Sequence, residues 1–144
     1  MAEFEYFNLN DVDPTFHPIP KGVYAYRVAK LEYRTVTPKS GKNAGVEVPI
    51  VSGSFSVINH DEFSGRRIRH TFWITNPYDQ KSLRRFADAI GIMQEPGEPL
   101  QAYIERLNSQ NPALEFRTFT DVKPGQDGGE GDNEMKWNQV LPIA

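Results

Sequence analysis

The segment Gly65–Ile74 combines cations and aromatic rings more closely than any other part of this 144-residue chain. In an extended strand, neighbouring side chains point to opposite faces, so Arg67, Arg69 and Trp73 share one face. The opposite face then carries Ile68, Phe72 and Ile74. Guanidinium groups hold phosphates and an indole ring stacks on nucleobases. The pattern therefore favours a nucleic-acid-binding strand, and the alternative is an exposed edge strand whose arginines pair with carboxylates.

A second basic segment, 37–45, is a turn by composition and contains Lys39 and Lys42. A phosphate-binding P-loop is excluded there. That motif needs a glycine where Val36 stands and Ser or Thr directly after its lysine, where this chain has Asn43. What remains is a basic hairpin loop, able to contact a phosphate backbone or to remain in solvent.

The predicted nucleic-acid contacts combine such cations with aromatic rings from the other extended segments. Cations neutralise phosphates and release counterions, and each stacked base contributes about 1–3 kcal/mol. Stacking accepts any base, so we expect little sequence preference. Aromatic residues other than Trp73 are also compatible with core positions. The predicted residues are Tyr33, Arg34, Lys39, Lys42, Arg67, Arg69, Trp73, Arg117, Phe119 and Trp137.

The residues available for catalysis are few. Cysteine is absent, and His17, His60 and His70 form no pair at metal-binding spacing. His60 lies in a turn and is predicted to be solvated, whereas His70 falls on the core side of its strand as a hydrogen-bonded structural residue. No G-x-S-x-G nucleophile motif occurs. We therefore predict a chain that is not an enzyme, with no catalytic residue, no metal site and no cofactor.

The charge distribution points in the same direction. The whole chain has a net charge of −3. Residues 21–85 hold 12 Lys or Arg and 5 Asp or Glu, a net charge of +7, so the rest of the chain carries −10. A basic middle between acidic ends supports an electropositive surface if the fold gathers the cations on one face.

The elements that position these residues follow from periodicity. Alternating segments that predict strands occur at 23–34, 46–58, 65–74, 113–120 and 135–140. In the first of them, the apolar side changes between Val28 and Ala29, which predicts a β-bulge. Two amphipathic helices follow the third strand. The first is capped by Asn76 and ends at Gly91, and the second carries apolar residues from Leu100 to Leu107.

This order predicts a mainly β chain, a β-barrel with a helical insert. The closest arrangement is a five-stranded OB-fold with two helices between strands 3 and 4, and the alternative is a twisted α+β sandwich. We expect a single OB-fold domain over 1–144, with an irregular lead-in at 1–20 and a flexible acidic loop at 124–134. No apolar run of about 18 residues occurs, so no membrane-spanning helix is expected. The acidic N-terminus and the absence of cysteine fit a cytoplasmic protein.

Short motifs support a family resemblance. They are Pro20–Tyr24, Ser40–Lys42, Phe63–Ile68, Asn76–Pro77 and Asn133–Lys136. With these motifs the chain resembles a phage-encoded family of small OB-fold single-stranded-DNA-binding proteins, over about residues 9–141. The resemblance implies single-stranded DNA as the partner, a role in phage DNA replication or recombination beside other proteins of that machinery, and the cytoplasm of a bacterial host. The alternative is a protein–protein interaction module in the same kind of complex.

Overall fold

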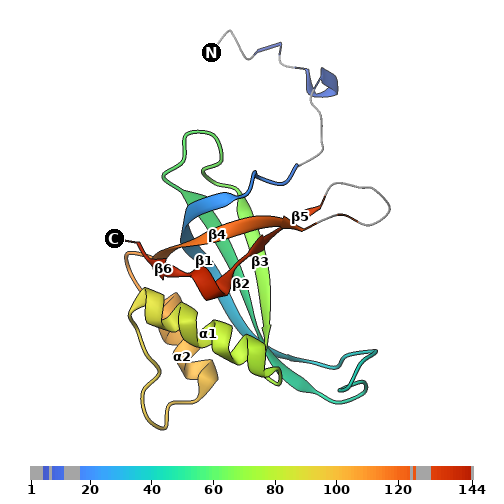
Figure 1. Ribbon diagram of the computed structural model, residues 1–144, viewed down its shortest axis with the longest axis vertical. Coiled ribbons are helices and arrows are strands. Elements are labelled where there is room, and N and C mark those ends of the chain that lie inside the picture. The colour runs from blue at the N-terminus through green and yellow to red at the C-terminus, as the bar shows by residue number, and fades with distance from the viewer. Residues whose placement is uncertain (1–4, 7, 12–16, 124, 126–130, 144) are drawn as a thin grey trace.

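The computed structural model describes residues 5–6, 8–11, 17–123, 125 and 131–143. Its main elements follow the chain in the order that Figure 1 shows. They are β1 (Gly22–Val36), β2 (Val48–Ile58), β3 (Arg67–Trp73), α1 (Pro77–Ile90), α2 (Leu100–Asn108), β4 (Glu115–Lys123), β5 (Asp132–Met135) and β6 (Leu141–Pro142). The prediction of a mainly β chain with two helices after the third strand is confirmed.

The strands form one antiparallel sheet in the order β3-β2-β1-β4-β5, and β6 pairs with β4 on the same edge as β5, opposite β1. β3 and β5 are the two ends of this order, and no ladder joins them within the described part of the chain. The barrel is therefore not closed. The prediction of five strands is wrong because β6 has only two residues, too few to produce a periodic pattern.

The long first strand serves two neighbours. Its first part pairs with β4 from Gly22 to Arg27, and it pairs with β2 from Ala25 to Val36. The register with β2 shifts between Val28 and Lys30, so the predicted bulge is confirmed. Beyond the bulge, where β4 no longer pairs with β1, Asn108 of α2 binds the Leu31 backbone. Its Oδ1 accepts from the Leu31 N–H at 2.9 Å and its Nδ2 donates to the Leu31 carbonyl at 2.6 Å.

The core lies on the concave side of the sheet and is rich in aromatic rings. Its fully buried large side chains include Tyr26, Phe55, Phe72, Phe86 and Phe116. The rings of Phe55 and Phe116 meet edge to face with centroids 5.4 Å apart, a favourable geometry for aromatic pairs. Gly53 makes room for this packing, because a Cβ at that position would lie 2.4 Å from Cζ of Phe55.

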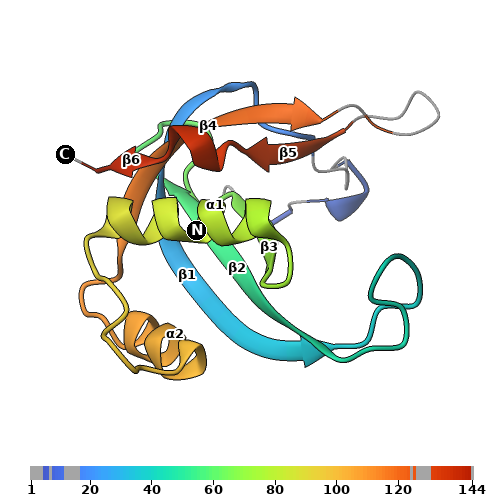
Figure 2. The same ribbon diagram turned by 60° about the horizontal axis from the view of Figure 1, so that its bottom comes forward.

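Both helices cover the core at one end of the sheet. α1 lies against β3, and α2 lies against β1 (Figure 2). The predicted caps of α1 are confirmed: the Asn76 side chain accepts from the Tyr78 N–H, and Gly91 adopts φ 77°. Within the described residues, no helix is long and apolar enough to cross a membrane.

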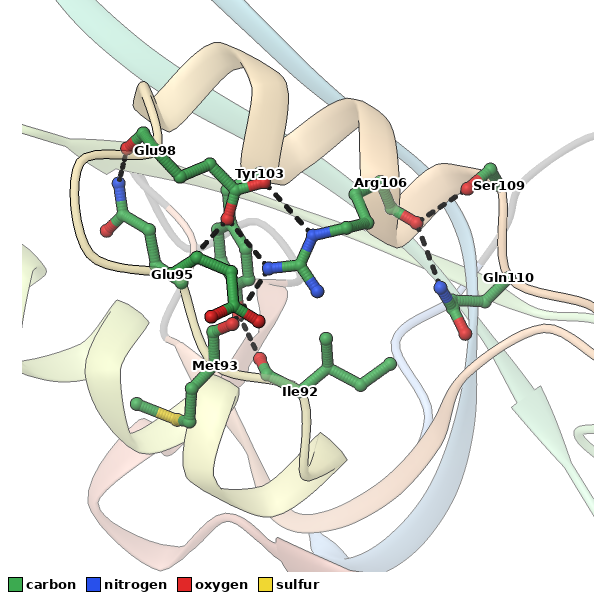
Figure 3. A network of polar contacts seen from close by, with 9 residues as sticks. Ile92, Met93, Glu95, Glu98, Tyr103, Arg106, Ser109 and Gln110 are labelled. Atoms are coloured by element: carbon green, nitrogen blue, oxygen red, sulfur yellow. Dashed lines mark hydrogen bonds and ion pairs between the residues drawn. The ribbon is translucent and has the colours of Figure 1, made fainter.

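An ion pair fixes the connection between the helices (Figure 3). Arg106 of α2 donates to both carboxylate oxygens of Glu98, at 2.7 and 3.0 Å, and to the Met93 carbonyl at 2.8 Å. These bonds lower the pKa of the Glu98 carboxyl, chiefly through the hydrogen bond from Arg106. The Tyr103 hydroxyl donates to the Ile92 carbonyl at 2.5 Å, which closes the connection over α2.

The end of the chain differs from its predicted form. A strand was expected over 135–140, but β5 ends at Met135 and a 3-10 helix, η4 (Trp137–Gln139), follows it. This turn directs the chain back toward β4, where β6 pairs. Most of the predicted acidic loop lies outside the described residues, and its last part, 132–134, belongs to β5. In the predicted lead-in, Ile19 is fully buried, and Asn133 binds its backbone N–H and carbonyl, both at 2.9 Å.

Candidate functional site

The convex side of β1, β2 and β3 places the predicted arginines next to further polar residues. Antiparallel register sets Lys30 opposite Ser54, and Ser54 opposite Arg69. Residues directly opposite each other in such a ladder lie about 4.5–5.5 Å apart, with their side chains on one face. We call this surface the basic face. It consists of Lys30, Arg34, Ser52, Ser54, Arg67, Arg69 and Trp73.

The alternation predicted for the third strand is confirmed, because Ile68 and Phe72 are buried while Arg67 and Arg69 are exposed. A shallow pocket of about 280 Å³ lies over the small serines of β2, between the cations of β1 and those of β3. Small side chains in the middle strand leave this space open. The convex surface therefore has a floor of serine hydroxyls with positive charge on two sides.

The two arginines of β3 differ in their partners from the cations of β1 on the same surface. Among the described residues, neither Arg67 nor Arg69 forms an ion pair or a side-chain hydrogen bond. Glu32 lies 3.4 Å from Lys30 and 3.8 Å from Arg34. A second acid among the described residues, Asp132, lines a neighbouring pocket with Arg67 and Arg69 but forms no ion pair with either of them. The geometry therefore does not favour the alternative, in which neighbouring acids pair with these arginines. Positive charge on β3 is available for an external anion.

Trp73 stands at the end of the basic face, opposite Ile50 of β2. Its indole is 36% exposed, whereas Ile50 is 2% exposed although it lies outside the main core cluster. The first turn of α1 fixes this end of β3. Asp79 accepts the Trp73 N–H at 2.9 Å, and the Gln80 side-chain amide donates to the Ile74 carbonyl at 2.6 Å. The ring is therefore accessible on a backbone that is held in place.

The basic loop between β1 and β2 folds back toward Trp73. Lys42 lines a pocket together with the indole, whereas Lys39 is exposed on the loop and does not line it. Of the ten predicted residues, five therefore lie on or beside one surface. They are Arg34, Lys42, Arg67, Arg69 and Trp73.

Two predicted stacking residues lie on the wrong side of the sheet. Trp137 is 2% exposed and its ring packs among Phe55, Phe72 and Phe116, so it is a core residue and its ring faces no ligand surface. Tyr33 lies opposite Val51 on the core face and is half-buried. The bulge after Val28 sets this orientation, because it moves the odd-numbered residues of β1 to the inside.

Two further predicted contacts lie on β4, beyond β1 and β2 as seen from β3. Arg117 pairs with Ala25 and donates through Nε to the Pro142 carbonyl at 3.0 Å. Phe119 is half-buried opposite Val23. β4 pairs with β1 only from Gly22 to Arg27, before the part that carries Lys30 and Arg34, so both residues lie apart from the basic face.

Sequence reasoning also missed residues that the fold places on this surface. Lys30, Ser52 and Ser54 join the basic face only through the register of β1 with β2. The alternation of serine with buried residues in β2 is the sequence signal that could have found two of them. Asn43 and Thr75, far apart in sequence, meet beside Trp73 with Nδ2 and Oγ1 3.4 Å apart, and no local pattern predicts that contact.

His70 lies on the core side of β3, as predicted, next to Phe72 and Trp137 with ring centroids 4.5 and 5.3 Å away. Its Nε2 is buried and has no hydrogen-bond partner among the described residues, so the expected hydrogen bond is not formed there. Burial lowers the pKa of His70 below its ordinary value of 6.5, although Asp79 and Glu134 act in the opposite direction. The neutral imidazole is the form that this site favours.

A pH-dependent stability follows from His70. The unfolded chain takes up the proton at a higher pH than the folded protein, so the free energy of unfolding falls as the pH decreases below 6.5. Chemical denaturation of the parent and of His70→Gln at about pH 7.5 and about pH 5.5 measures this contribution. We expect the variant to lose less stability between the two conditions than the parent. An identical loss in both proteins would contradict the assignment.

The described residues contain no group of three His, Asp or Glu side chains that could hold a metal ion. His60, in the turn between β2 and β3, uses Nδ1 to accept the backbone N–H groups of Glu62 and Phe63, at 3.1 and 3.0 Å. Its ring packs against Phe63 and Tyr24. The turn therefore explains this histidine structurally.

Comparison of the chain with protein-family models, with curated proteins and with solved structures gives no match.

Proposed function

We propose that the protein binds single-stranded DNA with little sequence preference through the basic face. One observation carries the proposal: Arg67 and Arg69 are exposed on one face of β3 without a carboxylate partner in the described residues, and an accessible indole follows them on the same strand. A phosphate chain along β3 would meet the two guanidinium groups in turn. A base from the same strand would then reach Trp73.

The preference for single strands rests on the aromatic residue. A base can stack on a side chain only when it is free of its own base-pair stack. Trp73 lies on the surface, 36% exposed, rather than on a projecting wedge that would enter a duplex. The basic face spans three adjacent strands, β1, β2 and the end strand β3, and none of its residues lies on a helix that could enter a major groove.

The OB-fold is part of the same proposal. The strand order β3-β2-β1-β4-β5, a bulged first strand shared by two neighbours, and helices between β3 and β4 fit this arrangement. OB-folds bind oligonucleotides on the face of strands 2 and 3 and with the loop between strands 1 and 2. Those are the elements that carry Arg67, Arg69 and Lys42 here.

The biological setting that we propose is phage DNA replication or recombination. Its support is the resemblance of the turn motifs to the phage-encoded single-stranded-DNA-binding family. Two of these motifs have structural roles: Asn76–Pro77 caps α1, and Asn133 binds the Ile19 backbone. The setting predicts that the chain acts on exposed single strands without chemical turnover.

A titration with oligo(dT) tests the proposal. Fluorescence should be quenched on binding, and the signal should come from Trp73 because Trp137 is buried. Affinity should fall steeply with salt, with a slope of log K against log salt of about −2 to −3.5 for three to five neutralised phosphates on a single strand. Anisotropy of a labelled oligonucleotide gives the same constants without relying on tryptophan.

Duplex DNA of the same length is the control. It carries more charge per unit length than a single strand, and we still expect it to bind more weakly at every salt concentration. Absence of binding to oligo(dT) at low salt would sink the proposal. In that case the basic face would be better explained as a docking surface for an acidic protein partner, the alternative drawn from the sequence.

A further inference from the structure

A second pocket, of about 410 Å³, lies where the β1–β2 loop meets the end of β3. It continues the basic face past Trp73, on the side of α1. We call it the base pocket. Its lining residues are Pro38, Ser40, Lys42, Asn43, Trp73, Thr75, Asn76 and Pro77.

The loop wall of the base pocket is preformed. The Gly45 N–H donates to the Pro38 carbonyl at 2.9 Å, and the Ala44 N–H donates to the Gly41 carbonyl at 3.2 Å. Gly41 and Gly45 adopt φ 88° and 78°, a backbone region that favours glycine. These bonds close the loop on itself, and Asn43 of the loop contacts Thr75 in the pocket wall.

The chemical groups in the pocket are of three kinds: an aromatic face, an ammonium group and uncharged hydrogen-bonding groups. Trp73 supplies the first and Lys42 the second. The N-terminus of α1 contributes little, because the Asn76 side chain already accepts the Tyr78 N–H at 2.8 Å. Asn43 holds Thr75 through one long contact of 3.4 Å, and its Oδ1 has no partner among the described residues.

From this combination we propose that the base pocket takes one unpaired purine of the bound strand. The purine stacks on Trp73, an edge of the base bonds to the Asn43 amide, and Lys42 contacts the neighbouring phosphate. A purine is favoured over a pyrimidine because its two rings give more stacking on the indole, and the volume of the pocket accommodates them. Amide side chains bond to base edges with paired donors and acceptors.

This inference rests on the proposed function and sharpens it. Binding along β3 remains tolerant of sequence, whereas one nucleotide position acquires a preference. Three oligonucleotides of one length separate the two claims: all-dT, dT with one central dA, and dT with one central abasic site. We expect the single dA to raise the affinity about tenfold over all-dT, and the abasic site to lower it. A second dA should add little.

The variant Asn43→Ala should still bind all-dT but should lose the preference for dA. Thr75→Val removes the same loop contact without touching the amide, and it should keep the preference. Lys39→Ala, on the same loop but outside the pocket, is the matched control and should also keep it.

Failure of the inference differs from failure of the proposed function. If no oligonucleotide binds, the proposed function is wrong. If all three bind equally well, or if Thr75→Val loses the preference as fully as Asn43→Ala, the base pocket does not read a base through Asn43. Anisotropy of the labelled strand is the measurement throughout.

Discussion

Replacing Trp137 by alanine is expected to lower the free energy of unfolding by about 3–5 kcal/mol, the usual cost of truncating a buried aromatic residue. The indole is 2% exposed and lies within 6 Å, centroid to centroid, of five other rings. Those rings are Phe55, His70, Phe72, Phe86 and Phe116. Deleting the indole leaves a cavity at the point where β2, β3, β4 and α1 meet. Denaturant unfolding followed by circular dichroism measures the loss.

The chain contains a matched control for this change. Trp73→Ala removes the same side chain from the opposite face of the sheet, where the ring is 36% exposed. We expect a smaller stability loss there than at Trp137, because more than a third of the residue is already in water and it lies outside the core cluster. The main effect of Trp73→Ala should instead be weaker oligonucleotide binding, because a stacking surface is lost. The two tryptophans thus separate stability from binding.

A second variant at the buried position tests the packing argument itself. The Nε1 group of Trp137 is buried without a hydrogen-bond partner among the described residues, so Trp137→Phe removes an unpaired donor while it keeps most of the ring volume. We expect it to cost clearly less stability than Trp137→Ala. Equal losses in the two variants would show that the position depends on something other than the filled volume.

The sequence predicted the side of the sheet correctly where alternation was unbroken. In β3 the apolar residues Ile68 and Phe72 alternate with arginines, and a single buried face explains the pattern. The cap of α1 was predictable for the same kind of reason, since Asn76 and Pro77 act on their own helix turn. Local rules are sufficient when the residues that form the sequence pattern and the structure that they determine lie within a few positions of each other.

Tyr33 shows where such rules stop. A bulge was predicted in β1, but the prediction did not fix which residue it would carry to each side. Arg34 and Tyr33 are neighbours, so a strand can present only one of them on the basic face. The register after Val28 selects Arg34. A shift of one residue decides which side chains meet a ligand, and it depends on pairing with β2 rather than on the strand itself.

The prediction that Trp137 contacts nucleic acid was wrong for a different reason. The predicted strand over 135–140 ends early, because the last residues turn through η4 to reach β4. The large ring of Trp137 fills a space in the core between β2, β3 and α1, where it packs against Phe55, Phe72 and Phe86. A tryptophan among polar residues gives no sign of partners so far away in sequence. By contrast, the neighbouring residues in the sequence were enough to predict that Arg67 and Arg69 lie on a charged surface.

Those two arginines carry the largest expected effect on function. The double variant Arg67→Ala/Arg69→Ala should weaken binding of oligo(dT) about 100-fold at low salt, since a hydrogen bond to a charged group contributes about 1.5–3 kcal/mol. The slope of log K against log salt should become shallower by about 1.4, the value for two fewer neutralised phosphates on a single strand. Stability should change little, because both side chains are exposed and have no ion pair among the described residues.

The control is Lys81→Ala/Arg84→Ala, which removes the same charge from the exposed side of α1. Arg84 pairs there with Asp88 at 3.1 Å, and neither cation belongs to the basic face. Because only contact with a phosphate releases its counterions, this variant should keep the parent slope and most of the affinity. Equal losses in the two double variants would mean that binding follows the net charge of the protein. A selective loss on β3 means that the strand binds along the basic face, where Lys30, Arg34 and Trp73 extend the contact.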